Sequence, residues 1–400
     1  QVRCVLVWLP PLSVAMRTCF AVVVAALAAS AELALVPLRD SLAVCTDGSQ
    51  AGYYWKSGAK KSKLWIVYLE GGGWCWDKDS CNERCGTHAK PNNSTMCSSN
   101  AFLKTRPLSG IFSPVQDRNL ARAHKIFVPY CTSDGHMGNA TAMGRHFRGA
   151  AVIQSVLRAA ANRGLGAAPG DQLLFGGTSA GGRGAMVHLD YVREMLGSAG
   201  RNVEVLGVLD SPLWIDIKPF SKTFVGFDNI TSSVHSYIQN PHLDQLCLAQ
   251  NRGFEWHCMF GQYRMPFLRT PYIVYASQYD AYQLGNNVGH EPVTWLERAY
   301  AEEFARRTKQ LVGQLKADWR PSPIQAGRVT QNAVFSWACY NHAVSTWSEG
   351  FDELSCTAKH VTEHAALSQF LRSGVNGGPL EWVDQCTGFE CGMGCSAVLI

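Results

Sequence analysis

The sequence lacks the features that mark several classes of protein. Beyond residue 31 no stretch is apolar for long enough to cross a membrane, and no run of lysine or arginine is dense enough to mark a nucleic-acid surface. The net charge of +5 is a mild bias over 400 residues. No repeat, low-complexity linker or abrupt change of composition divides the chain. We therefore expect no nucleic-acid partner, no stable membrane span in the mature protein, and one domain over residues 32–400.

Cysteine, by contrast, is plentiful. The chain has 15 cysteines, more than a reduced cytosolic protein needs. It also carries Asn-x-Ser/Thr sequons, which make candidate glycosylation sites of Asn92, Asn93, Asn139 and Asn229. Both features predict a protein that follows the secretory route and ends outside the cell or in the cell wall.

The N-terminal residues agree with export. A Met-Arg pair at residues 16–17 precedes an apolar run over residues 19–29, which ends in a small-residue sequence typical of a cleavage site. We therefore interpret residues 1–31 as upstream residues followed by a signal peptide. The alternative is an uncleaved signal anchor, whose apolar span Pro10 and Pro11 would interrupt.

The cysteines are expected to form disulfides. Removal of the leader discards Cys4 and Cys19, so 15 cysteines become 13, and at least one is expected to be unpaired or bonded to another chain. Clusters over residues 75–97 and 386–395 could suggest zinc, but their spacing repeats no paired Cys-x-x-Cys pattern and no histidine pair accompanies them. We predict no metal site, and the disulfide pairing stays open.

Short apolar strands alternate with helices along the chain. Amphipathic spacing predicts helices over residues 147–161 and 294–319. Near-continuous apolar strands between helices indicate a mostly parallel sheet with helices on both faces. Residues 212–271 show less periodicity, and we interpret them as an insertion over the mouth of an active site. The five expected strands cover residues 64–69, 125–129, 172–175, 203–209 and 272–276.

The segment Gly177-Thr178-Ser179-Ala180-Gly181 follows one of these strands and precedes a helix-like stretch. This is the context of a nucleophile elbow, in which a strained strand-to-helix turn exposes a serine between glycines that prevent collisions. The alternative is a simple glycine-rich loop. With the expected sheet, the motif indicates an α/β-hydrolase fold in which Ser179 is the nucleophile and the N–H of Ala180 faces the oxyanion.

A nucleophilic serine needs a histidine base and an acid that orients it, and this fold places them in the order serine, acid, histidine. Asp280 and Asp210 each follow an expected strand, so both are candidate acids. Asp134 precedes Ser179 and is in the wrong order. The residues alone leave the choice between Asp280 and Asp210 open.

Four histidines follow Asp280, at positions 290, 342, 360 and 364. His360 and His364 are spaced as on one face of a helix, among polar residues, which fits an exposed helix. His342 differs because it follows an apolar strand-like run, in a turn that begins with Cys339. We therefore take His342 as the candidate base.

The first expected strand runs into consecutive glycines, in the sequence Glu70-Gly71-Gly72-Gly73-Trp74. Backbone N–H groups in such a loop can approach a ligand oxygen with no side chain in the way. The alternative is a phosphate-binding loop, which is disfavoured because no lysine and hydroxyl residue follow in the required order. We expect this loop to supply a second oxyanion donor.

Together, these segments resemble the pectin acetylesterases of plants and the related Notum-type carboxylesterases, over roughly residues 45–395. Any one motif would be weak, but their joint order is specific. The segments that carry the resemblance are Cys45–Ser49 with Gly52–Tyr54, Leu69–Cys75, Phe147–Gly149, Gly177–Gly182, and Tyr279–Gln283 followed by Cys339–His342.

The resemblance implies a role for each site residue. Its pattern makes a catalytic triad of Ser179, Asp280 and His342, with oxyanion donors at Gly73, Trp74 and Ala180. It favours Asp280 as the acid because Asp210 matches an Asp-x-Gly segment of the family, altered here to Asp-Ser-Pro. This departure bears on the substrate pocket.

We therefore expect a secreted serine carboxylesterase that is monomeric and needs no metal or organic cofactor. The leading substrate is a polysaccharide such as pectin that carries a short acyl group, most simply acetyl. The alternative is a Notum-type deacylase that removes a long acyl chain from a secreted protein. A further alternative is an inert binding protein on a hydrolase scaffold.

Overall fold

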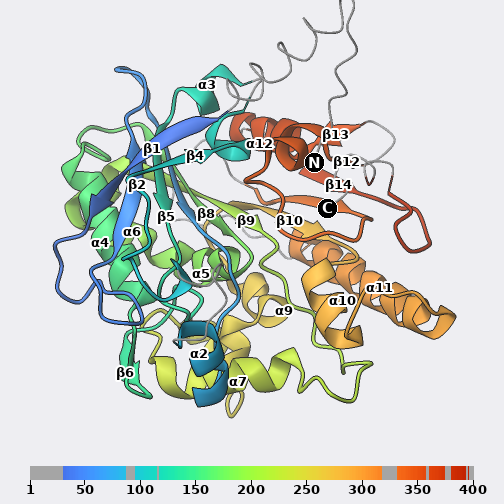
Figure 1. Ribbon diagram of the computed structural model, residues 1–400. Coiled ribbons are helices and arrows are strands. Elements are labelled where there is room, and N and C mark those ends of the chain that lie inside the picture. Colours follow the sequence, from blue (N-terminus) through green and yellow to red (C-terminus); the bar gives the residue numbers. More distant parts are fainter. Residues whose placement is uncertain are drawn as a thin grey trace, which may run out of the picture.

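A sheet of ten strands forms the centre of the molecule (Figure 1). The computed structural model describes residues 30–86, 95–114, 117–317, 331–356, 360–373, 380–392 and 395. Across the sheet the strands follow the order β14-β11-β10-β9-β8-β3-β5-β2-β1-β4. In the same order their bounds are Leu380–Val383, Ala333–Trp337, Tyr272–Ser277, Val203–Asp210, Asp171–Thr178, Leu64–Leu69, His124–Val128, Gly52–Lys56, Ala31–Pro37 and Thr105–Leu108.

The strands from β14 to β5 are parallel, whereas β2, β1 and β4 form an antiparallel edge. All five expected strands are present, so the prediction of a mostly parallel sheet is confirmed. The antiparallel edge was not predicted. One reason is that β4 contains Pro107, which removes a backbone donor and is tolerated only at the edge of a sheet.

Helices cover both faces of the sheet, and each face has its own apolar core. Side chains of α4, α5, α7 and α11 contribute to one core, and those of α3 and α12 to the other. The helices from α2 to α12 span Lys78–Cys85, Arg118–Ala121, Gly149–Asn162, Ala180–His188, Val192–Met195, Phe227–Ile238, Gln245–Gln250, Gly261–Arg264, Ala281–Val288, Trp295–Ala317 and Glu363–Arg372. Two small sheets pair β6 (Ala140–Ala142) with β7 (Arg145–Phe147) and β12 (Ser355–Cys356) with β13 (Val361–Thr362).

The two expected helices are present as α4 and α11. The expectation of an exposed helix that carries His360 and His364 was wrong. His360 precedes β13 and lies outside the helix, whereas His364 lies in α12 and is buried. The His364 ring stacks on Phe351, and its Nδ1 lies 2.9 Å from a carboxylate oxygen of Asp352. Packing against these residues overrides the polar character of the surrounding sequence.

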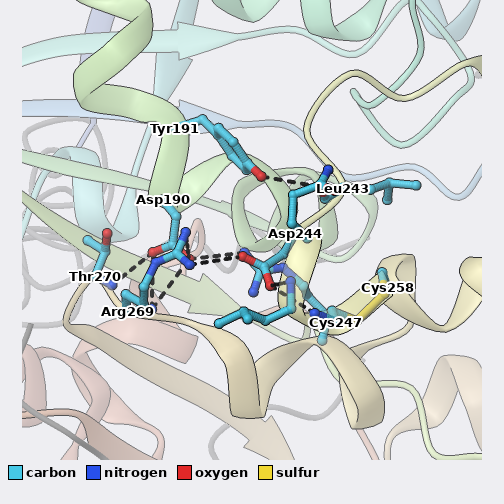
Figure 2. Close-up of polar contacts among 11 residues, drawn as sticks. Asp190, Tyr191, Leu243, Asp244, Cys247, Cys258, Arg269 and Thr270 are labelled. Atoms are coloured by element: carbon cyan, nitrogen blue, oxygen red, sulfur yellow. Dashed lines mark hydrogen bonds and ion pairs between the residues drawn. A yellow bond between two sulfur atoms is a disulfide. The ribbon is translucent and has the colours of Figure 1, made fainter. Parts of the chain in front are cut away.

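The segment 212–271 connects β9 to β10 and carries α7, α8 and α9. Its end is fastened to the residues that follow α5 (Figure 2). The Asp190 carboxylate, on a side chain that is 2% exposed, accepts from the backbone N–H of Thr270 at 2.9 Å and from the guanidinium of Arg264 at 3.1 Å. Arg269 pairs with Asp244 at 3.2 Å. The bonds to Asp190 fix the segment against the part of the chain that carries the elbow, whereas the Arg269–Asp244 pair lies within the segment.

The cysteines of both clusters form disulfides, as predicted. Six bonds are present, and Cys356 is buried and unpaired among the described residues, as an odd number of mature cysteines requires. The bond between Cys339 and Cys395 fastens the turn before His342 to the chain's C-terminal region. The remaining pairs are Cys45–Cys131, Cys75–Cys81, Cys85–Cys97, Cys247–Cys258 and Cys386–Cys391.

Within the described ranges, no helix is both long enough and apolar enough to cross a membrane. Residues 1–29 of the expected leader, which was predicted to span residues 1–31, lie outside these ranges, as do the sequons at Asn92 and Asn93, whereas Ala31 begins β1. Asn139 and Asn229 are exposed on the surface. Both are therefore accessible to a glycosylating enzyme, and their modification stays a prediction.

Candidate active site

Ser179 occupies a strained turn between β8 and α5. Its φ of 54° lies in the left-handed region, which a non-glycine residue adopts only when its surroundings hold it there. A Cβ on Gly177 would lie 2.5 Å from the backbone of Gly181, and a Cβ on Gly181 would lie 2.2 Å from the carbonyl oxygen of Leu69. The glycines two residues to either side of Ser179 are therefore required by close packing, as the motif predicted.

Asp280 and His342 meet although 62 residues separate them. The His342 Nδ1 lies 2.7 Å from Oδ2 of Asp280, while Oδ1 of Asp280 accepts from the backbone N–H of Gln283 at 2.9 Å. Asp280 follows β10 and caps α10, so its side chain is held at the carboxyl end of the sheet. The Nε2 of His342 has no hydrogen-bond partner within the described part of the chain and can accept a proton from a nucleophile.

Ser179 and His342 line the same cavity, which has a volume of about 580 Å³. One wall is polar and contains the ion pair between Arg106 and Glu70, at 2.5 Å. The other lining residues include the three glycines of the loop after β3, Tyr282, and the largely apolar set Pro107, Leu108, Phe127 and Trp347. The cavity therefore offers both a polar wall and an apolar surface beside the serine.

The glycine loop packs directly against the serine. A Cβ on Gly71 would lie 3.0 Å from the Cβ of Ser179, and a Cβ on Gly73 would lie 3.3 Å from the hydroxyl of Tyr282. Gly73 also has a φ of 66°, which favours glycine. Trp74 and Ala180 are buried and are not among the residues that line the cavity, so their role as oxyanion donors stays a prediction.

The environment of His342 suits a general base. Burial alone would lower its pKa, but the Asp280 carboxylate outweighs burial and raises the pKa of His342 above its usual 6.5. The Tyr282 ring stacks on the imidazole with ring centroids 5.3 Å apart. The ring of His342 is therefore fixed on one face by Tyr282 and at Nδ1 by Asp280.

A buried arginine lies behind the site. The Arg183 guanidinium, one turn after Ser179, stacks 3.5 Å from the ring centre of Trp214 and 4.3 Å from that of Trp74. Burial lowers its pKa to about 10, so it remains charged at neutral pH. This cation–π stack fixes the side chain of Trp74 at the end of the glycine loop.

Comparison with known proteins identifies the family. The pectinacetylesterase family model matches residues 25–396. This chain belongs to the pectinacetylesterase family. It is 31% identical over 382 residues to palmitoleoyl-protein carboxylesterase notum2 of Xenopus laevis, an alignment that covers 90% of this chain and 74% of the relative. It is 29% identical over 393 residues to human palmitoleoyl-protein carboxylesterase NOTUM, covering 92% of this chain and 74% of the relative.

Solved structures agree with the sequence comparison. The structure of the Wnt deacylase Notum from Drosophila matches with a TM-score of 0.80 and 27% identity, and the match covers 91% of this chain and 100% of the other. The predicted family resemblance and α/β-hydrolase fold are thus confirmed, as is the general class of enzyme that acts on carboxylic esters. The roles of individual site residues stay predictions.

The other sequence candidates lie elsewhere. Asp210 is fully buried at the end of β9, where Ser211 and Ser345 donate to its carboxylate. Asp134 is buried in the loop after β5, where Thr132 binds it. His290 is exposed and lies 3.6 Å from Glu297. None of these residues lines the cavity beside Ser179.

Sequence reasoning assigned no role to several residues that shape the site. Arg106 lies on β4, a strand that was not expected, so nothing linked it to the cavity. Glu70 precedes the glycine loop, and its position there was the available signal. Tyr282 belongs to a motif that carries the family resemblance, but only the fold places its ring on His342.

Segment 212–271, expected over the active-site mouth, does not contribute to the lining of this cavity. It reaches the site indirectly, because the Phe227 ring packs 5.8 Å from that of Tyr282. The position of the segment over the mouth stays a prediction.

Proposed function

We propose that this protein is a secreted carboxylesterase whose catalytic triad is Ser179, Asp280 and His342. The observation that carries the proposal is the Asp280–His342 hydrogen bond beside the cavity that Ser179 also lines. Serine hydrolases need this combination of a nucleophile on a strained turn, a base and an orienting acid.

The reaction proceeds through an acyl-enzyme. Ser179 Oγ forms a bond to the ester carbonyl carbon while its proton passes to Nε2 of His342. The bond between the carbonyl carbon and the alcohol oxygen then breaks, and His342 returns the proton to the leaving alcohol. Water next gives a proton to His342 and attacks the acyl-enzyme, which releases the acid and restores Ser179. Asp280 stabilises the imidazolium at each stage.

The oxyanion donors in this proposal are the backbone N–H groups of Gly73, Trp74 and Ala180. Gly73 lines the cavity, and Ala180 directly follows the nucleophile at the start of α5. Donors fixed by a rigid backbone stabilise the negative charge that develops on the carbonyl oxygen without rearranging, which is a large contribution to catalysis in acyl transfer.

We propose an acylated secreted protein as the substrate, with an acyl chain longer than acetyl. Two observations support this choice over the polysaccharide substrate that sequence analysis placed first. The sequence relatives bear names of palmitoleoyl-protein carboxylesterases, and the matched fly structure is titled a Wnt deacylase. The cavity of about 580 Å³ falls within the range of pockets that enclose drug-sized ligands, and Leu108, Phe127 and Trp347 make part of it apolar.

An acetylated polysaccharide remains a second candidate because of the polar wall. Arg106 and Glu70 carry hydrogen-bonding groups to the edge of the cavity, where sugar hydroxyls could bind. The name of the matching family also points to acetyl esters of pectin.

One measurement separates the candidates. Hydrolysis of p-nitrophenyl esters from acetate to hexadecanoate is measured with the purified protein and with Ser179→Ala. A maximum of kcat/KM at octanoate or longer supports the protein deacylase, and a maximum at acetate supports the polysaccharide esterase. Hydrolysis at no chain length contradicts the proposal and favours an inert binding protein.

A further inference from the structure

The loop that carries His342 is strained and depends on neighbouring residues. Ala343, directly after the histidine, has a φ of 59°, a conformation that is unfavourable for a non-glycine residue. The backbone N–H of Ala343 donates to Oγ of Ser211 at 3.0 Å, and Ser211 itself has a φ of 51°. Two strained turns therefore meet beside the base.

Asp210 joins these two turns. Its Oδ2 accepts from the backbone N–H of Ser345 at 2.9 Å and from the hydroxyl of Ser345 at 2.7 Å. Its Oδ1 accepts from the hydroxyl of Ser211 at 3.0 Å, and so aligns the group that holds Ala343. A single buried carboxylate thus fixes the histidine loop at two points, one residue and three residues after His342.

The same residue also contacts the nucleophile. The carbonyl oxygen of Asp210 accepts from the backbone N–H of Ser179 at 2.9 Å. A Cβ on Gly182, in the first turn of α5, would lie 2.4 Å from this oxygen, so the elbow helix packs directly on Asp210. The backbone of Asp210 binds the serine turn, and its side chain binds the histidine loop.

We infer that Asp210 is a positioning residue that holds Ser179 and His342 in register for proton transfer. Its carboxylate does not bind the imidazole, whose Nδ1 is taken by Asp280, so it acts through the loop. The inference rests on the proposed function, because register matters only if Ser179 transfers a proton to His342. A displacement of about 1 Å between reacting groups can lower a rate by about a hundredfold.

Two substitutions of Asp210 separate geometry from charge. Asp210→Ala removes all three side-chain hydrogen bonds. Asp210→Asn keeps three contacts, because the amide oxygen can accept both bonds from Ser345 and the amide N–H can donate to the Ser211 hydroxyl, which reverses the direction of that one bond. If the residue positions the loop, we expect Asp210→Ala to lower kcat about ten- to a hundredfold with KM within about threefold, and Asp210→Asn to keep most of kcat.

A matched control comes from the opposite end of the neighbouring strand. Asp171 begins β8 and is also a buried carboxylate, which accepts from the backbone N–H of Gly166 at 2.9 Å and pairs with Lys63 at 3.3 Å. Asp171→Ala removes comparable bonds at the start of β8, at the end of the strand opposite to Ser179. We expect it to lower the melting temperature and leave kcat of the folded enzyme unchanged.

The experiment measures kcat and KM on p-nitrophenyl butyrate, the rate at which a fluorophosphonate labels Ser179, and the melting temperature. A fall in kcat and labelling rate for Asp210→Ala, with rescue in Asp210→Asn and none in Asp171→Ala, supports the inference. Equal losses in the alanine and asparagine variants of Asp210, or unchanged kcat in folded Asp210→Ala, would overturn it.

A second variant covers the case in which Asp210→Ala does not fold. Ser345→Ala removes one bond to Asp210 and the contact of 2.6 Å between the Ser345 and Tyr68 hydroxyls. We expect a several-fold loss of kcat in this variant, and an unchanged kcat contradicts the inference. Absence of hydrolysis and labelling in the unaltered protein would refute the proposed function instead, so the two failures are distinguishable.

Discussion

The ends of the neighbouring strands β9 and β10 carry one aspartate each, and the two differ in what binds them. Asp210 ends β9, and Asp280 follows β10 after a short connection. Both are buried, at 0% and 3% exposure, so burial does not distinguish them. The Asp210 oxygens are occupied by serine donors, whereas Oδ2 of Asp280 binds the His342 imidazole.

This difference shows that a position at the carboxyl end of a parallel strand is insufficient to define a catalytic acid. The carboxylate must also face the base, and its remaining oxygen must be held. Asp280 meets both conditions because α10 begins directly after it, so Oδ1 caps the helix while Oδ2 stays free for His342. Asp210 is followed by Ser211 in a strained turn that directs its carboxylate toward Ser345.

Ser179→Ala should have the largest effect, because in the proposed mechanism both aspartates act through Ser179. We expect kcat to fall on the order of a thousandfold or more, while the chain stays folded because only a small hydroxyl is lost. Ester hydrolysis and circular dichroism on the same sample check this. Retention of most activity in the alanine variant would show that the elbow serine is not the nucleophile.

A comparison of Asp280→Asn with Asp210→Asn tests directly which of the two aspartates is the acid. The Asp280 change removes the acceptor that orients His342, so we expect kcat to fall by roughly a thousandfold or more. Asp210→Asn keeps its hydrogen bonds to the loop and should alter stability or KM far more than kcat. Steady-state kinetics on matched, folded samples give the answer, and the reverse ranking would make Asp210 the acid.

The pH dependence of kcat/KM should also distinguish the two aspartates. The pKa of His342 is raised because the Asp280 carboxylate outweighs burial, with a smaller contribution from Asp210 and an opposing one from Arg183. Since the base must be neutral, kcat/KM should fall as pH decreases through this raised pKa, with half of maximal activity above pH 6.5.

In Asp280→Asn the acidic limb should move to lower pH, and in Asp210→Asn it should move less. A profile of kcat/KM from pH 5 to 9 measures both shifts. Identical profiles for the three proteins would mean that His342 is not the group that titrates.

The free cysteine and the glycosylation sites should have the smallest effect on activity. Protein secreted from eukaryotic cells, denatured without reductant, should show one reactive thiol, that of Cys356, because the other described cysteines are paired. Glycosidase should lower its mass, and Asn139→Gln and Asn229→Gln should each remove part of that change with kcat unaltered. Thiol labelling and intact mass measure these outcomes. A fully reduced, unglycosylated secreted protein would contradict the secretory prediction.

Much of the fold was predictable because its signals are local. The five expected strands were recognisable as short apolar runs in the sequence. The elbow requires glycine at positions 177 and 181 because a side chain there would collide with nearby backbone atoms. The antiparallel edge was missed because its stability depends on pairing between segments far apart, as between β1 and β4. The buried His364 was misjudged because its neighbours Phe351 and Asp352 are brought to it by the fold.

The sequence was sufficient to predict the turn at Ser179, the glycine loop and the alternation of strands and helices, since each depends on short-range sterics and periodicity. Without the family resemblance it left two candidate acids, although it favoured His342 as the base. Only the tertiary structure brought Asp280 to His342 across 62 residues and directed the carboxylate of Asp210 to Ser345 across 135. The physical reason is that a hydrogen bond depends on the direction of side chains from different strands, which no local pattern encodes.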